Sequence, residues 1–282
     1  MNKIKKGDIV GRISYGKDII FVVKKIIHLK NGRKMALLKG VTERIEATSY
    51  IEDLCLINKE IIENNIRSLE FKLETRIEAK KKNNPKYKNT IEYNKRTKRK
   101  NITGKILHLD GDKKYSEKSL RYYNKLGLNA IVKNIPEYKQ PKYVYNLLEY
   151  YKPDILVITG HDGMIKKESG YNDIYNYRNS KHFVNTVKEA RRYDEENKKN
   201  LVIFAGACQS YYEALIMAGA NFASSPARIL IDFLDPLIVA ENIAIADNYK
   251  YITIDDISNE LRDGKKGVGG VGANGKKRIE EQ

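Results

Sequence analysis

The feature that most constrains the fold is a change of pattern near Lys105. From there, apolar runs of strand length alternate with stretches of helical periodicity, in the order KILHLDGD, YSEKSLRYYNKLG, LNAIVKNI, YVYNLLEYY, DILVITGHDG, HFVNTVKEARRYDEEN and LVIFAGACQS. Continuous apolar strands separated by helices of about 10–15 residues are typical of βαβ units around a parallel sheet buried on both faces. The sequence therefore predicts an α/β domain over residues 105–262, with a parallel sheet flanked by helices.

Residues 1–57 have a different pattern, in which short β-rich runs are separated by turns. The runs cover 8–13, 19–28 and 34–39, and a less regular one covers 44–57. Two such runs joined by Asn31-Gly32 are typical of a hairpin, and several together favour a small barrel of SH3-like size. We therefore expect an N-terminal SH3-like β-barrel module.

The segments on either side of the α/β domain are expected to differ from it. In residues 58–104, apolar positions from Ile61 to Ile77 recur at helical spacing and predict one amphipathic helix, which runs into a linker rich in Lys, Arg and Asn. Such a linker is expected to be solvated. Residues 263–282 are glycine-rich and basic, which predicts a mobile tail or a flexible loop.

Composition excludes several classes of protein. The 282 residues carry a formal net charge of +17, which favours polyanions or acidic surfaces as neighbours but defines no function. The two cysteines, Cys55 and Cys208, lack the paired spacing of a zinc site or a disulfide framework, so neither a metal nor a cofactor is expected. An apolar signal region and a run of about 18 apolar residues are both missing. We expect neither Sec export nor a membrane span.

Reactive side chains follow three of the apolar runs. These runs end in Asp110-Gly111-Asp112, His161-Asp162-Gly163 and Cys208-Gln209-Ser210. The ligand crevice of an open α/β sheet lies at the carboxyl ends of its strands, so these residues are candidates for a site. A single cysteine after a strand is more often a buried small hydrophobe, and a single histidine more often a hydrogen-bonded loop residue.

His161 and Cys208 are more informative as a pair. Each follows an apolar run and small residues, and strands joined by one right-handed crossover often lie side by side. A thiol near an imidazole can ionise at neutral pH and act as a nucleophile. Small residues beside Cys208 leave room for a substrate carbonyl, and the backbone N–H groups of Gly163 and Cys208 are candidate oxyanion donors.

The residues around this pair resemble a known group of cysteine peptidases. His161 precedes the Ala207-Cys208 dipeptide by about 50 residues, the spacing of caspase-type signatures. Caspases, gingipains, clostripain and legumain share an apolar run ending in His-Gly and another ending in Ala-Cys. This chain departs from that pattern, because Asp162 stands between His161 and Gly163.

The resemblance extends to one family over nearly the whole chain. The β-rich N-terminal module, KILHLDGDKKY, ITGHDG, FAGACQSYYEAL, NFASSPARILIDFLDP and GVGGVGANGKKRI are similar to the YabG family of sporulation-specific cysteine proteases. This resemblance implies a caspase-like fold and a catalytic pair at His161 and Cys208. It also implies mother-cell synthesis and association with the spore coat. Spore coat and cortex-associated precursors would be cleaved after Arg or Lys, and the basic linker is a candidate for self-cleavage.

A basic residue at P1, the substrate residue before the cleaved bond, requires a buried acid in its pocket, because a desolvated guanidinium must be paired. Asp112 and Asp110 follow the first strand of the α/β domain, and Asp232 lies in LIDFLDP. We rank them in that order as candidates. Each Asp has a second interpretation, as a helix N-cap or a loop carboxylate.

Two other functions remain open at this stage. Asp110-x-Asp112 after a first strand is also typical of haloacid-dehalogenase-type phosphatases, which use an Asp nucleophile and Mg²⁺. The high positive charge is compatible with a non-catalytic scaffold that binds nucleic acid or spore-coat anions. Both alternatives leave His161 and Cys208 without a role. The tyrosines form no ordered stacking pattern, so nucleic acid is not favoured.

Overall fold

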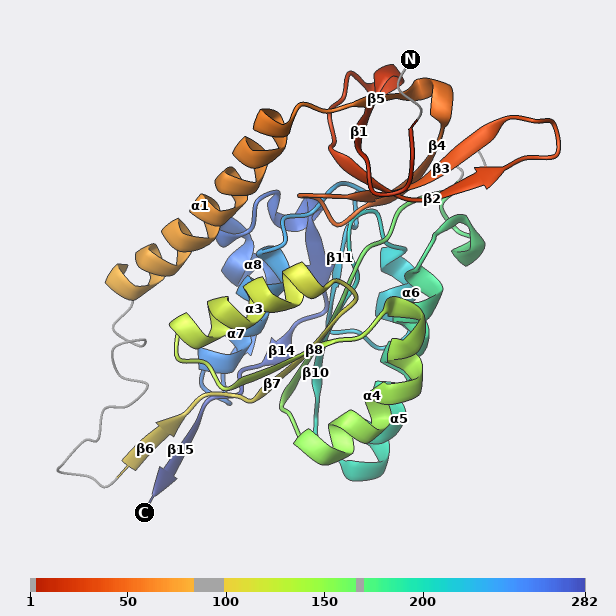
Figure 1. The fold of residues 1–282 in the computed structure, drawn as a ribbon. Coiled ribbons are helices and arrows are strands. Elements are labelled where there is room, and N and C mark those ends of the chain that lie inside the picture. The colour runs from red at the N-terminus through yellow and green to blue at the C-terminus, as the bar shows by residue number, and fades with distance from the viewer. Residues whose placement is uncertain (1–3, 84–98, 166–169, 282) are drawn as a thin grey trace.

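The computed structural model describes residues 4–83, 99–165 and 170–281. An N-terminal antiparallel sheet lies at one end of a larger α/β domain, and a long helix, α1 (Lys59–Asn83), runs from the first onto the second (Figure 1). This helix falls where the apolar spacing predicts it. Within the described ranges, no helix combines the length and the apolar character needed to cross a bilayer.

The N-terminal sheet has five strands in the order β4-β3-β2-β1-β5. These strands are β1 (Ile9–Arg12), β2 (Phe21–His28), β3 (Lys34–Gly40), β4 (Glu46–Tyr50) and β5 (Leu54–Leu56). They match the predicted β-rich runs, and Gly32 has the positive φ of 79° that the β2–β3 turn requires.

A closed barrel is not found among the described residues, because β4 and β5 are the two edges of this sheet and do not pair with each other. The expectation of an SH3-like barrel is therefore not confirmed. One physical reason is that β5 is only three residues long, which leaves little backbone for closure. A second is that Glu46, the first residue of β4, donates its N–H to Asp162 of the other domain at 2.8 Å.

The α/β domain contains a six-stranded sheet in the order β13-β11-β10-β9-β7-β8. All neighbouring pairs are parallel except β11 with β13. The strands are β7 (Ile106–Asp110), β8 (Ala130–Asn134), β9 (Ile155–Thr159), β10 (Val202–Ala205), β11 (Phe222–Ser224) and β13 (Val268–Gly270). The predicted parallel sheet is thus confirmed in its main part, with one antiparallel edge strand.

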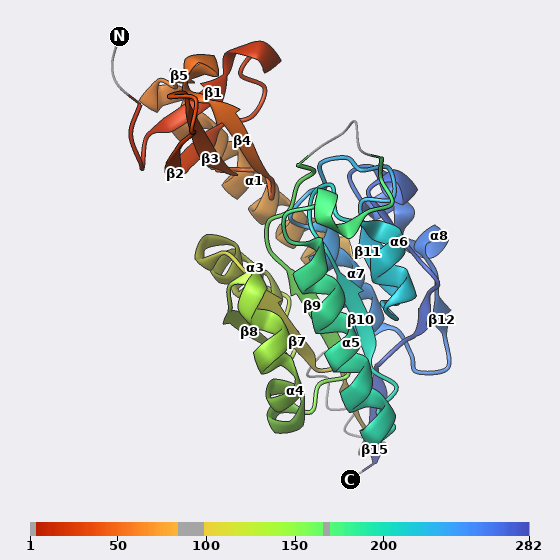
Figure 2. The same ribbon diagram turned by 90° about the vertical axis from the view of Figure 1, so that its right-hand side faces the viewer.

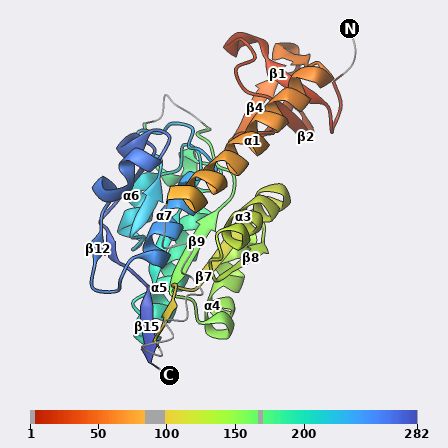
Figure 3. The ribbon, with the colours of Figure 1, turned by 90° about the vertical axis from the view of Figure 1, so that its left-hand side faces the viewer.

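Helices cover both faces of this sheet. They are α3 (Lys113–Lys125), α4 (Gln140–Tyr151), α5 (Ser180–Asn197), α6 (Tyr212–Met217), α7 (Asp235–Ile245) and α8 (Ile254–Ile257). Alternate residues of each strand point to opposite faces, so Val157 of β9 packs in the cluster with α3 and α7, and Ile158 packs with α4 and α5. Figure 2 looks onto α5 and α6, and Figure 3 looks onto α1 and α7 on the opposite side.

The glycine-rich C-terminal segment is partly integrated into the fold. Besides β13, it contributes β14 (Ala273–Asn274), which pairs with β12 (Tyr251–Ile252), and β15 (Arg278–Glu281), which pairs with β6 (Arg99–Ile102). The expectation of a mobile tail is therefore wrong for these strands. Glycine is needed here for close packing, since a Cβ on Gly270 would lie 2.2 Å from the Asn221 carbonyl oxygen.

Candidate active site

The three strand ends singled out by the sequence meet at one edge of the sheet. Strand β9 lies between β7 and β10, and the register pairs Asp110 with Thr159 and Ile158 with Ala205. All three strands are parallel, so the loops that follow them emerge on the same side. Asp110, His161 and Cys208 are all fully buried there.

The loops that carry His161 and Cys208 are bonded to each other. The Ser210 hydroxyl donates to Asp162 Oδ2 at 2.9 Å and accepts the N–H of Ala207 at 2.9 Å. A second link runs from the Met164 N–H to Gln209 Oε1 at 3.3 Å. These bonds join the residue after the histidine to the residue before the cysteine, and so fix the relative position of the two loops.

The inserted residue Asp162 is a buried structural carboxylate. Besides Ser210, it accepts the hydroxyl of Ser180 at 2.5 Å and the N–H groups of Asn179 at 2.8 Å and Gly163 at 2.9 Å. Burial raises the pKa of Asp162 to about 6, and these hydrogen bonds act in the opposite direction. The Gly163 N–H, expected to be an oxyanion donor, is thus engaged with the Asp162 side chain.

His161 is held by its backbone, and its ring makes no hydrogen bond within the part of the chain that the structure describes. Its N–H donates to Glu137 Oε1 at 2.8 Å, and Gly111 and Gly160 provide the space for that carboxylate, since a Cβ on either would meet it within 2.3 Å. Among the described residues, neither ring nitrogen has a hydrogen-bond partner. The ring lies beside Tyr115, with centroids 5.9 Å apart.

The surroundings of His161 keep its ring neutral. Burial is the largest effect and lowers the pKa of His161 to about 3. The positive charges of Lys39 and Arg44 lower it further, and the negative charge of Asp112 acts in the opposite direction. The ring is therefore unprotonated near neutral pH, and its low pKa makes it a weak base for as long as it stays buried in this way.

Cys208 is covered by the N-terminal sheet. Its side chain packs in the same apolar cluster as Leu38 and Ile45 of that sheet, and its thiol donates to the Ile231 carbonyl oxygen at 3.7 Å. Burial raises the pKa of Cys208 to about 12, the nearby Glu43 carboxylate adds to this, and the backbones of Ile231 and Arg44 act in the opposite direction. The thiol is therefore protonated while this cover is in place.

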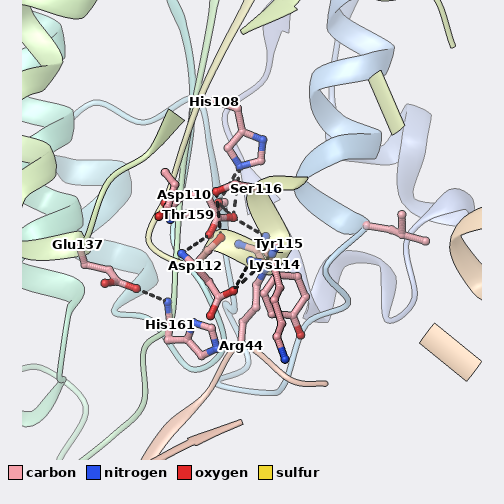
Figure 4. Close-up of polar contacts among 12 residues, drawn as sticks. Arg44, His108, Asp110, Asp112, Lys114, Tyr115, Ser116, Glu137, Thr159 and His161 are labelled. Atoms are coloured by element: carbon pink, nitrogen blue, oxygen red, sulfur yellow. Dashed lines mark hydrogen bonds and ion pairs between the residues drawn. The ribbon is translucent and has the colours of Figure 1, made fainter. Parts of the chain in front are cut away.

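The loop between β3 and β4 inserts an arginine into the edge of the sheet. Arg44 is almost fully buried, and its Nη2 donates to Asp110 Oδ2 at 2.6 Å (Figure 4). Its guanidinium also lies over the Tyr115 ring, 4.6 Å from the centroid. A desolvated guanidinium held by a carboxylate and an aromatic face is the arrangement expected in a pocket for a basic residue.

A buried network supports the Asp110 carboxylate. Thr159 Oγ1 donates to Asp110 Oδ2 at 2.8 Å, and the Asp112 N–H donates to Oδ1 at 2.8 Å. His108 lies 2.7 Å from Thr159 Oγ1, and burial lowers the pKa of His108 to about 3. Burial opposes ionisation of Asp110, but the Arg44 charge and these hydrogen bonds outweigh it, so the pKa of Asp110 is lowered and the carboxylate is charged.

The other two acidic candidates have different partners. Asp112 is the N-cap of α3, accepting the N–H groups of Lys114 and Tyr115, and it pairs with Lys39 at 2.9 Å. Asp232 accepts the Leu234 N–H and pairs with Lys72 of α1 at 3.0 Å. Of the three candidates, Asp110 is thus the one bonded to a buried arginine, whereas the sequence alone favours Asp112.

Sequence reasoning missed three residues of this site. Arg44 opens an irregular β-rich run, Tyr115 is one of several tyrosines in α3, and Glu137 lies in a single helical turn (Glu137–Lys139) after β8. None belongs to a motif with fixed spacing. The available signal was indirect: Gly111 and Gly160 mark a close approach, and the group that approaches them is Glu137.

The backbone of the Arg44 loop also pairs with the histidine loop. The Asp162 N–H donates to the Arg44 carbonyl oxygen at 3.3 Å, and Ile45 forms a parallel β-bridge with Asp162. Gly163 allows this approach, because a Cβ there would lie 2.3 Å from the Glu46 carbonyl oxygen. A segment bearing an arginine is therefore bound by both its side chain and its backbone.

Comparison with known proteins gives one consistent result. The family model described as YabG peptidase U57 matches residues 5–281. The chain is similar to the sporulation-specific protease YabG of Bacillus subtilis (strain 168), with 38% identity over 283 aligned positions. That alignment covers 97% of this chain and 96% of the relative.

Proposed function

Because the chain belongs to the YabG family of peptidases, we propose that it is a cysteine endopeptidase with Cys208 as nucleophile and His161 as general base and acid. The single observation that carries the proposal is the Arg44–Asp110 pair, buried at the same sheet edge as both residues. The thiol, the unprotonated imidazole and the Arg44–Asp110 pair follow three neighbouring strands at this edge, and the proposed mechanism requires the thiol to turn from the Ile231 carbonyl oxygen towards His161.

In this mechanism His161 takes the thiol proton of Cys208 as the sulfur attacks the carbonyl carbon of the P1 residue. The C–N bond breaks, His161 gives the proton to the leaving amine, and water then hydrolyses the thioester. We propose the N–H groups of Asp162 and Cys208 as oxyanion donors, since Asp162 already donates to a carbonyl oxygen at 3.3 Å. Asp162 N–H takes the place expected for Gly163, whose N–H is engaged elsewhere.

Asp110 is the acid that selects Arg or Lys at P1. Its position at the end of β7 and its bonds to Thr159 and the Asp112 N–H fix the carboxylate before a substrate arrives. Such preorganisation favours a cation that fits and penalises a neutral side chain. Asp112 contributes its charge near His161, and Asp232 takes no part in this pocket.

The biological setting follows from the relative, which is named a sporulation-specific protease. We propose that this chain processes spore coat and cortex-associated precursors during sporulation, in association with the developing coat. Self-cleavage in the basic linker, expected between Arg96 and Lys100, falls partly on residues 84–98, which lie outside the described residues, and partly on the start of β6.

The alternatives weighed on sequence have less support. A phosphatase would need the carboxylates of Asp110 and Asp112 to face a substrate and Mg²⁺, yet both are directed at protein donors. A non-catalytic scaffold does not account for membership of a peptidase family.

The test is cleavage of a short peptide with one internal arginine, after preincubation of the enzyme. Cys208→Ala and His161→Gln are each expected to lower kcat/KM by at least about 10⁴-fold, because each removes a partner of a unit that acts together. Cys55→Ala, which removes the other cysteine, is the matched control and keeps activity. Full activity of Cys208→Ala would refute the proposal.

The same assay tests the P1 acid. Asp110→Asn is expected to lower the preference for arginine over a neutral P1 residue by about 10²–10³-fold, because a guanidinium in this pocket would lose its charged partner. Asp232→Asn, which removes an acid outside the pocket, should leave the preference unchanged. If the two variants behaved in the opposite way, the pocket would have been assigned to the wrong acid.

A further inference from the structure

The Arg44 loop combines the contacts that a substrate would make on both sides of the P1 residue. The side chain reaches the acid of the pocket, Asp110, at 2.6 Å. The carbonyl oxygen accepts the Asp162 N–H at 3.3 Å, and Cys208 packs in the same apolar cluster as Ile45, the residue after Arg44. These contacts bring the Arg44–Ile45 peptide bond to the residues assigned as nucleophile and oxyanion donor.

The residues after Arg44 continue along the site as a bound chain would. Glu46 donates its N–H to the Asp162 carbonyl oxygen at 2.8 Å, and the Arg178 Nε donates to the Glu46 carbonyl oxygen at 3.2 Å. A cleft of about 690 Å³ adjoins this segment and is lined by both domains, including Ile45, Thr48, Met164 and Arg178. Space therefore remains on the side where the residues after the cleaved bond lie.

A purely structural contact explains this arrangement less well. Burying a charged pair gives little net stability, and apolar side chains of similar volume often hold an interface equally well. Two of the guanidinium nitrogens, Nε and Nη1, have no hydrogen-bond partner among the described residues. An arginine in such surroundings, with its backbone paired to Asp162, is better explained as a residue bound in a substrate pocket than as a contact that only joins the two domains.

We infer that the Arg44–Ile45 bond is this chain's own processing site, and that Arg44 occupies the P1 pocket as an intramolecular substrate until the bond is cut. This inference rests on the proposed function. Cys208 Sγ attacks the Arg44 carbonyl carbon, the C–N bond to Ile45 breaks, and the Ile45 amine receives the proton held by His161. Water then hydrolyses the thioester, leaving an Arg44 carboxylate and a free thiol.

The cut separates two pieces that stay paired in the fold. Strand β3 ends before the bond and pairs with β4 after it, and β1 likewise pairs with β5. The pieces are therefore to be detected under denaturing conditions. Until the cut, the tethered arginine competes with added substrate at an effective concentration in the millimolar range, so a peptide at about 10 µM is outcompeted roughly 100-fold.

The experiment follows the purified full chain by intact-mass spectrometry and follows hydrolysis of a short arginine peptide in parallel. The wild type is expected to give a fragment ending at Arg44 and one beginning at Ile45, at a rate independent of protein concentration. Peptide hydrolysis should lag until the cut. Arg44→Gln should remain uncut at this bond and show no lag, with an initial rate about 100-fold above that of the uncut wild type.

Three controls distinguish cleavage after an Arg44 that is bound in its own active site from cleavage after any accessible arginine. Arg33 is exposed in the β2–β3 turn, so Arg33→Gln should still be cut after Arg44. Cys208→Ala should stay intact, also when mixed with active wild type, because its Arg44 is buried in its own site. Cleavage after Arg33 instead of Arg44, or cutting of Cys208→Ala by the wild type after Arg44, would overturn the inference.

Failure of the inference can be told apart from failure of the proposed function. If the wild type cleaves the arginine peptide without a lag and its own chain stays intact at Arg44–Ile45, the inference is wrong and the proposed function stands. If the wild type cleaves neither the peptide nor itself, the proposed function is wrong, and the inference falls with it.

Discussion

His161 illustrates how burial determines the protonation of individual residues in this site. Its ring has no hydrogen-bond partner among the described residues, and it faces the charges of Lys39, Arg44, Asp112 and Asp110. Desolvation outweighs the carboxylates, and the pKa of His161 falls to about 3. The same burial raises the pKa of Cys208 to about 12, so the pair is held as neutral imidazole and thiol beneath the N-terminal sheet.

The lowered pKa predicts a pH dependence of stability. Below pH 6.5 the unfolded chain takes up a proton on His161 and the folded chain does not until about pH 3, so the stability associated with a neutral ring is lost as pH falls. The comparison is Cys208→Ala against Cys208→Ala/His161→Gln in urea unfolding at pH 7, 6 and 5. Below pH 6, the unfolding free energy of Cys208→Ala, which keeps His161, should fall relative to that of the double variant by about 1.4 kcal/mol per pH unit. A constant difference would mean that the folded state protonates His161 normally.

At the scale of elements, the site depends on two loops being joined. Parallel strands β9 and β10 bring their ends to the same edge, but the positions of the loops beyond them are set by side chains. Ser210 contacts both Asp162 and the Ala207 N–H, and so links the histidine loop to the cysteine loop. Asp162, which interrupts the His-Gly pattern, supplies the carboxylate at the centre of this link.

We expect Ser210→Ala to lower kcat for an arginine peptide by about 10–100-fold, because small displacements of a nucleophile from its base are costly. Ser180→Ala is the matched control. Its hydroxyl donates to the same carboxylate from α5 and accepts the Tyr211 N–H at 2.8 Å, so it contacts the chain three residues after Cys208 and not the Ala207 N–H directly before it. It should cost a similar amount of stability and much less kcat. Equal losses of kcat in the two variants would show that the network supports the fold generally instead of positioning Cys208.

At the scale of the whole molecule, the N-terminal sheet covers the sheet edge that carries His161 and Cys208, and α1 packs from this sheet onto the α/β domain (Figure 1). Leu73 and Ile77 of α1 pack in the cluster with α3 and α7. On the same helix, Lys80 pairs with the fully buried Glu241 at 3.1 Å, and Arg76 lies 3.9 Å from it. Some of the positive side chains behind the net charge of +17 are thus paired with buried acids inside the molecule.

The ion pairs between α1 and Glu241 give a stability prediction, which is tested in the Cys208→Ala background to prevent self-cleavage. Replacing Arg76 and Lys80 together by Met removes two cations from the buried Glu241 carboxylate, which should cost about 3–5 kcal/mol in urea unfolding. Lys72→Met is the control, because Lys72 is half-exposed and its pair with Asp232 should contribute about 1 kcal/mol or less. Similar losses in the two proteins would mean that burial of Glu241 is not the source of the stability.

The sequence by itself determined the parallel core of the α/β domain, the helix α1 and the choice of His161 and Cys208 as candidates, because these follow from local periodicity and from the order of strands along the chain. It did not determine which acid meets a basic side chain. Asp110 and Asp112 are two residues apart, and the difference between them is that one points into the edge of the sheet and the other caps α3.

Only the tertiary structure revealed that Arg44 and Glu137 belong to the site. Both come from distant parts of the chain, and their positions depend on how the N-terminal sheet and the turn after β8 pack against the ends of β7 and β9. The open edge of the N-terminal sheet and the ordered glycine-rich strands were decided in the same way, by contacts between segments that no local pattern encodes. Periodicity reports the environment of a single element, whereas a catalytic pocket is made by contacts between several.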